Sequence, residues 1–94
     1  MIVRWTARAL ADLTSIENYQ RRHWPESRAA FERRLTAIER RIAEFPQSAP
    51  EVTQRPGTRV VAFLDLPYRL FYTVESDAII ILAIRHASRQ SLFE

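Results

Sequence analysis

Residues 68–89, YRLFYTVESDAIIILAIRHASR, decide the fold, because they contain two strand-like segments joined by a short acidic turn. Residues 79–84, IIILAI, have no polar side chain. Side chains alternate between the two faces of a strand, so this strand must be covered on both faces or must present a binding surface. The rest of the chain offers two helices, which suffice for one layer. A second cover is therefore expected, either from a partner or from residues 91–93.

Composition excludes several kinds of chemistry. The chain has 94 residues, a net charge of +3 and 14 basic residues, all of them arginine. Lysine-based catalysis is therefore excluded. The planar guanidinium group of arginine can bind carboxylates and phosphates and can stack on aromatic rings. The absence of cysteine excludes disulfides and thiolate sites and fits a reducing cytoplasm. Residues 1–5 lack the apolar core of a signal peptide, and no run reaches the length of a membrane span. We expect one cytoplasmic domain over residues 1–94.

Two amphipathic helices are predicted in the first half of the chain. Residues 2–5 form a short strand candidate, Thr6 can cap a helix, and residues 7–23 have helical spacing. A second helix begins at Pro25, and its apolar residues follow one stripe. Its other face, which carries Arg34 and Arg41, is expected to be solvated. The residues expected to be buried are Leu10, Leu13, Ile16 and Tyr19 in the first helix and Phe31, Leu35, Ile38, Ile42 and Phe45 in the second.

Three strands are predicted in the second half. A proline-containing loop ends in a turn at Pro56 and Gly57. The strands follow at residues 59–65, 68–74 and 78–86, and their short connections require antiparallel neighbours. A strand, a helical hairpin and a three-stranded antiparallel meander give an α+β domain of two layers, in the order β-α-α-β-β-β.

In this order and spacing, the residues resemble the RelE/ParE superfamily of toxins from type II toxin-antitoxin systems. The resemblance covers nearly the whole chain, and the predicted element order agrees with the compact fold of that superfamily. The residues that carry it are Val3-Arg4-Trp5-Thr6 with Ala9, Asp12 and Leu13, then Ile16, Tyr19, Phe45-Pro46, Arg59, Tyr68-Arg69-Leu70-Phe71-Tyr72 and the ending from His86 to Arg89.

The resemblance implies a protein partner. Antitoxins of this superfamily wrap a C-terminal segment across the toxin and bury apolar and arginine-lined surface, which would supply the missing cover and give a hetero-oligomer. The residues expected to bind the antitoxin are Arg69, Phe71, Arg85, His86 and Arg89. The tail residues Ser91, Leu92 and Phe93 are expected to bind the target. We expect no cofactor, and a metal site is improbable because the chain has two histidines and no carboxylates at ligand spacing.

The superfamily contains two mechanisms. Ribosome-dependent members cut mRNA with basic and aromatic groups that stabilise charge and move protons. Here Arg69, His86 and Arg89 would be the catalytic residues. However, Ala62 and Leu64 stand where such nucleases carry lysines, and the late tyrosine is missing.

ParE-like members block DNA gyrase and need no nuclease site, so a gyrase inhibitor that is not an enzyme is the main hypothesis. The mRNA endonuclease is the alternative, and a plain nucleic-acid-binding module is the least supported class because acids interleave with the arginines.

Purely structural roles for the same residues remain as alternatives. Arg69 can pair with an acidic residue and hold the sheet, and His86 can make a backbone hydrogen bond at a strand end. His23, beside a helix junction, suits a capping or packing role. Glu51 is a conceivable general base in the loop, but no second catalytic group accompanies it in the sequence.

Overall fold

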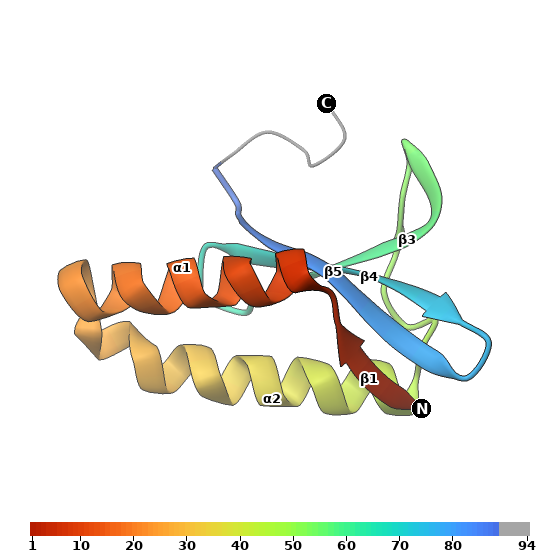
Figure 1. Cartoon of the computed structure of the whole chain (residues 1–94), viewed down its shortest axis with the longest axis horizontal. Helices are drawn as coiled ribbons and strands as arrows, with labels where there is room; N and C mark the ends of the chain where they lie inside the picture. The colour runs from red at the N-terminus through yellow and green to blue at the C-terminus, as the bar shows by residue number, and fades with distance from the viewer. Residues whose placement is uncertain (89–94) are drawn as a thin grey trace.

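Five strands form one sheet in the order β1-β5-β4-β3-β2 (Figure 1). The computed structural model describes residues 1–88. The N-terminal strand β1 pairs parallel to β5 at one edge, and the other neighbours are antiparallel. The predicted α+β fold with a C-terminal meander is confirmed. The elements are β1 (Ile2–Trp5), α1 (Ala7–His23), a 3-10 turn η1 (Pro25–Ser27), α2 (Arg28–Glu44), β2 (Glu51–Val52), β3 (Arg55–Ala62), β4 (Tyr68–Glu75) and β5 (Ala78–His86).

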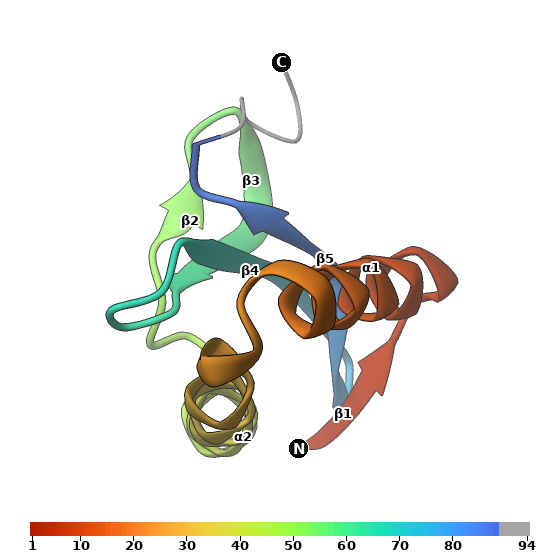
Figure 2. The same cartoon turned by 90° about the vertical axis from the view of Figure 1, so that its left-hand side faces the viewer.

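The two helices lie side by side and pack on one side of the sheet, while β2 and β3 bend away from them (Figures 1 and 2). The core between the layers is made by apolar residues from α2, β4 and β5, and its largest members are almost fully buried. Phe31 of α2 stacks on Phe63 at a centroid distance of 5.1 Å and meets the edge of Tyr68 at 5.3 Å. The most deeply buried large apolar side chains are Phe31, Ile42, Leu70, Tyr72, Ile79 and Ile81.

Helix α1 completes the edge of β5 where β1 ends. The backbone N–H of Thr6 donates to the carbonyl of Ile81 at 3.1 Å, and its hydroxyl donates to the carbonyl of Leu82 at 3.2 Å. The same hydroxyl accepts from the N–H of Ala9 at 3.0 Å, which is the predicted helix cap. The N–H of Ile84 donates to Oδ2 of Asp12 at 3.1 Å. Thr6 and Asp12 thus satisfy backbone groups of β5 that a longer β1 would have paired.

Three residues predicted to be buried are exposed. Leu10 is 50% exposed because the buried stripe of α1 runs instead through Ala9, Leu13, Ile16 and Gln20. Tyr19 is also exposed, and its ring lies 4.9 Å from that of His23, which fits the predicted packing role of this histidine. Phe45 ends α2 with φ −126° and ψ 77°, so its side chain leaves the helical stripe and is 52% exposed.

The predicted turn at Pro56 and Gly57 is wrong. Both residues lie inside β3, which runs from Arg55 to Ala62 rather than over residues 59–65. Gly57 has a φ of 91°, where β2 and β3 change register: Val52 faces Arg55, but Glu51 faces Arg59. The glycine therefore permits a bulge in the strand, and the chain reverses before it.

Within residues 1–88, no helix is long and apolar enough to cross a membrane.

Candidate functional site

A β-bulge in β5 decides which side chains share a face. Phe71 of β4 faces Ala83, but the next residue, Tyr72, faces Ile81, so Leu82 is the extra residue. An unbroken strand would place residues 79, 81, 83 and 85 on one face. The bulge instead brings Ile84 into the core with Ile79 and Ile81. Arg85 therefore turns away from the helices, and His86 turns toward them.

We call the side of the sheet away from the helices the second face. The cross-strand pairs place Arg69, Phe71 and Thr73 of β4 on it, beside Arg85, Ala83 and Ile80 of β5. Most of the apolar run of β5 points into the core, and Ala83 is fully buried on the second face. The expected large exposed apolar strand is therefore reduced to a smaller surface in which Ile80 is partly buried and Arg69 is exposed.

Arg69 and Arg85 face each other directly across β4 and β5. Directly opposed residues on one face have Cβ atoms about 4.5 to 5.5 Å apart, so two positive charges adjoin here. Within residues 1–88, no carboxylate lies at ion-pair distance from either arginine. The acidic partner expected for Arg69 is thus not found in that part of the chain. Nε of Arg85 is buried and has no hydrogen-bond partner there.

His86 lies on the opposite face, with Tyr68 as its cross-strand partner. Its ring meets the edge of the Tyr68 ring at a centroid distance of 5.7 Å. Nδ1 of His86 accepts from the N–H of Ser88 at 3.2 Å, and the Ser88 hydroxyl lies 2.6 Å from the same nitrogen. The predicted backbone hydrogen bond at a strand end is confirmed. The side chains of His86 and Arg69 therefore leave the sheet on opposite faces.

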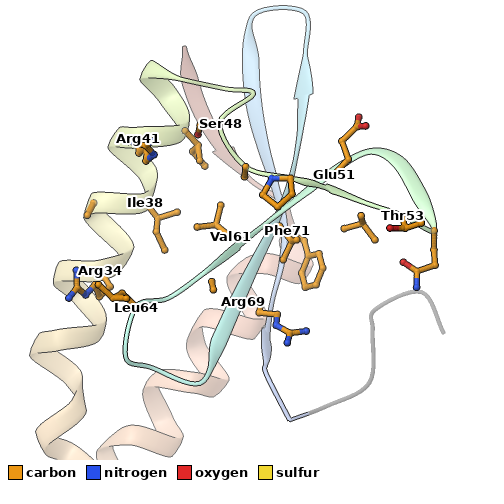
Figure 3. A pocket seen from close by; sticks show the side chains of 18 of the residues that line it. Arg34, Ile38, Arg41, Ser48, Glu51, Thr53, Val61, Leu64, Arg69 and Phe71 are labelled. Carbon is orange, nitrogen blue, oxygen red and sulfur yellow. The ribbon is translucent and has the colours of Figure 1, made fainter.

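A groove of about 1160 Å³ lies beside Arg69 and passes between α2 and the edge of β3 (Figure 3). Arg34, Ile38 and Arg41 line it from α2, while Arg69 and Phe71 line it from β4. Leu64, which is 60% exposed, lies at the same end as Arg34. The sequence pattern missed the two α2 arginines as groove residues. Both flank the apolar stripe next to Ile38, which is the signal that could have found them.

The edge of β3 is only partly covered along this groove. Strand β2 pairs with β3 at Arg55 and Arg59, and the last loop contact is the hydrogen bond from Val60 N–H to the Pro50 carbonyl at 3.1 Å. Beyond that point, the pairings among residues 1–88 place no further strand beside Val61 and Ala62. An open edge next to an apolar groove is a common docking place for an extended peptide.

Arg59 and Tyr72 hold the loop that shapes the groove. Arg59 donates to the carbonyl of Ala49 at 2.6 Å, and the Tyr72 hydroxyl donates to the carbonyl of Pro46 at 2.7 Å. Glu51 accepts from the N–H of Gly57 at 3.0 Å and lies 4.0 Å from Arg59. Arg59, which entered the prediction only through the family resemblance, is therefore a structural residue, and Glu51 is engaged in the bulge of β3.

Two buried tyrosines adjoin these elements. Burial raises the pKa of the Tyr68 hydroxyl, and the nearby Gln20 amide partly offsets this increase. The polar atoms of Gln20 are buried without a partner that meets hydrogen-bond geometry. Burial also raises the pKa of Tyr72. Both hydroxyls stay protonated at neutral pH, so neither is suited to act as a general base.

The other candidate residues belong to the C-terminal end of the sequence. Arg89, Ser91, Leu92 and Phe93 lie outside the described residues. Among residues 1–88, no three histidine or carboxylate side chains gather in a way that could hold a metal ion.

Comparisons with known proteins agree with this fold. Toxin RelE2 of Caulobacter vibrioides is 36% identical over 87 residues, which are 93% of this chain and 96% of that protein. The solved chromosomal ParDE toxin-antitoxin system from P. aeruginosa contains a chain with a TM-score of 0.74 and 24% identity, covering 94% of this chain and 97% of the other. The isolated E. coli RelE toxin has a TM-score of 0.59 and 18% identity, covering 98% and 89%.

The sequence model described as the ParE toxin of type II toxin-antitoxin system, parDE, matches residues 3–91. With this match over nearly the whole chain, and the curated relative at 36% identity, the chain belongs to the ParE toxin family of the RelE/ParE superfamily of type II toxins.

Proposed function

We propose that this toxin arrests growth by inhibiting DNA gyrase and that a cognate antitoxin neutralises it. The observation that supports gyrase inhibition over RNA cleavage is the separation of Arg69 from His86. Their cross-strand partners place them on opposite faces of the sheet. A general acid or base must come within hydrogen-bond reach of the atoms that a charge-stabilising arginine contacts.

The surroundings of Arg69 support the same conclusion. Its cross-strand neighbours are Ala62 on β3 and Arg85 on β5. Ala62 offers no proton donor or acceptor on its side chain, and a guanidinium does not release its proton near neutral pH. Inhibition by binding needs only a complementary surface, for which the tail residues Ser91, Leu92 and Phe93 are the proposed target contacts.

We propose the groove and the adjoining second face as the antitoxin surface. Arg69, Phe71 and Arg85 are the proposed contacts at the sheet end, and Arg89 is included from the sequence. His86, which was also expected from the sequence to bind the antitoxin, contacts Tyr68 on the helix side, and we leave it out of this proposal. The aliphatic lining between α2 and β3 would take apolar side chains of an extended segment, and the open edge of β3 offers backbone hydrogen bonds.

The alternative is a ribosome-dependent mRNA endonuclease that uses Arg69, His86 and Arg89. One observation favours it: the relative at 36% identity carries the name Toxin RelE2. The two functions differ in target, so a paired assay separates them.

Purified toxin should be added to DNA gyrase with relaxed plasmid and, in parallel, to a translating extract whose mRNA is read by primer extension. We expect supercoiling to fall with toxin dose and mRNA to stay intact. The antitoxin, added beforehand, should restore supercoiling. Cleavage within codons, together with normal supercoiling, would instead establish the endonuclease.

A further inference from the structure

Arg69 and Arg85 form a charged pair with no counter-ion among residues 1–88. They are directly opposed on the second face, and like charges in this position destabilise a sheet. Nε of Arg85 is buried with no hydrogen-bond partner in the same part of the chain, and an unmet buried donor on a charged group also disfavours the folded state. The opposed charges and the unmet donor both disfavour the folded state, so the stability of the free toxin does not explain why the two arginines lie here.

The bulge at Leu82 creates this arrangement. Without the extra residue, the alternation of side chains would place Arg85 on the helix side and leave Arg69 alone. Bulges redirect side chains and commonly lie next to functional sites. The register of β5 therefore places the side chains of Arg69 and Arg85 next to each other on the second face.

The chemistry of the pair suits a carboxylate. A guanidinium presents parallel N–H donors whose spacing matches the two oxygens of a carboxylate, and two such groups can bind one acid from both sides. Phosphate would also match the charge. However, the neighbours Phe71 and Ala83 are buried, so they offer no exposed ring on which a nucleotide base could stack. The adjoining groove combines the aliphatic side chains of Ile38, Val61 and Leu64 with Arg34 and Arg41, a lining that fits a peptide with apolar and acidic side chains.

We propose that Arg69 and Arg85 together hold one side-chain carboxylate of the antitoxin segment that lies in the groove. This proposal rests on the antitoxin surface described above. It adds that one acidic residue of this segment is bound by both arginines at the sheet end of the groove. The acid supplies a counter-charge to both arginines, and because Nε of Arg85 is buried, the exposed part of that guanidinium would make the contact.

The first test needs neither antitoxin nor gyrase. In the isolated toxin labelled with 15N, the Nε–Hε signal of Arg85 should be followed while sodium acetate replaces sodium chloride at constant ionic strength. We expect a saturable shift that is lost in Arg69→Gln and retained in Arg22→Gln, which removes an exposed charge from α1, on the helix side of the sheet. No saturable shift, an equal shift in Arg69→Gln, or a response to phosphate but not to acetate would overturn the proposal.

The second test uses the complex. Arg85→Gln should weaken antitoxin binding by about tenfold or more, as expected for a charge-assisted hydrogen bond, and Arg22→Gln on α1 should change it less than about twofold. The melting temperature of the free Arg85→Gln toxin at low salt should stay equal or rise by about 1 to 5 °C, because a like-charge contact is removed. A fall in melting temperature beside the lost affinity would assign Arg85 a structural role and overturn the proposal.

The two tests distinguish failure of this site from failure of the proposed function. A missing acetate response in a toxin that still binds its antitoxin contradicts the carboxylate site alone. A toxin with an acetate response that leaves gyrase active contradicts gyrase inhibition alone.

Discussion

Asp12 offers the sharpest test of how α1 is fixed to the sheet. Its Oδ2 accepts the N–H of Ile84 at 3.1 Å, at the edge of β5 that β1 does not reach. Replacing Asp12 with alanine leaves this N–H without a partner. A hydrogen bond to a charged acceptor contributes about 1.5 to 3 kcal/mol, and leaving a buried donor unmet has a similar effect. The Asp12→Ala variant should therefore lose about 1.5 to 3 kcal/mol of unfolding free energy.

The same carboxylate also lies 3.9 Å from Nε of Arg8, so the two interactions must be separated. The Arg8 side chain is 52% exposed, and such surface pairs contribute about 0 to 1 kcal/mol. Arg8→Ala should therefore cost less than about 0.5 kcal/mol. Asp12→Asn keeps an acceptor oxygen and should fall between the two variants.

Urea unfolding followed by circular dichroism measures these differences. For a domain of this size, the expected loss in Asp12→Ala corresponds to a drop in melting temperature of about 6 to 20 °C. A loss in Arg8→Ala as large as that in Asp12→Ala, or a loss below about 0.5 kcal/mol in Asp12→Ala, would show that the bond to Ile84 does not fix α1 to the sheet.

Three further predictions follow from burial and from the tail. Ile42→Ala should lose about 2 to 5 kcal/mol in urea unfolding, whereas truncation of the exposed Phe45 should lose much less, and equal losses would contradict the observed end of α2. Burial raises the pKa of Tyr68 and Tyr72 above the usual 10.0, so the folded state retains these protons better than the unfolded state. This stabilisation is present below pH 10 and is lost as the pH rises through the folded pKa values. In Tyr72→Phe, the melting temperature should therefore fall less steeply with pH above 10 than in the unmodified toxin. An unchanged slope would contradict a contribution from Tyr72. Deletion of residues 91–94 should reduce growth arrest more than it reduces melting temperature or antitoxin binding, and full toxicity of the shortened chain would show that these residues do not bind the target.

The sequence predicted those parts of the fold that depend on local pattern. The cap at Thr6, the bounds of α1 and the bounds of β5 are as expected, because capping chemistry, helical spacing and β propensity act within a few residues. Phe45 was mispredicted because helical spacing does not show where the backbone leaves the helix. Pro56 and Gly57 are typical of a turn, but here the positive φ of Gly57 serves a bulge.

The candidate site was harder to predict, because it depends on pairing between strands. Strict alternation along residues 78–86 puts Arg85 and His86 on the wrong faces. Only the extra residue in β5 corrects this assignment, and bulges have no strong local signal in an all-apolar run. Arg69 was expected to lie on a binding surface, and it is exposed. That Arg85 opposes it, and that His86 does not share its face, required the register of the sheet.

The most direct test of the central claim is the order in which DNA and protein synthesis stop after the toxin is induced. Cells should be pulse-labelled with thymidine and with methionine within minutes of induction, with antitoxin co-expression as the control. We expect thymidine incorporation to fall first while methionine incorporation continues, and we expect the antitoxin to restore both. An immediate loss of methionine incorporation with continued DNA synthesis would contradict gyrase inhibition and place the target in translation.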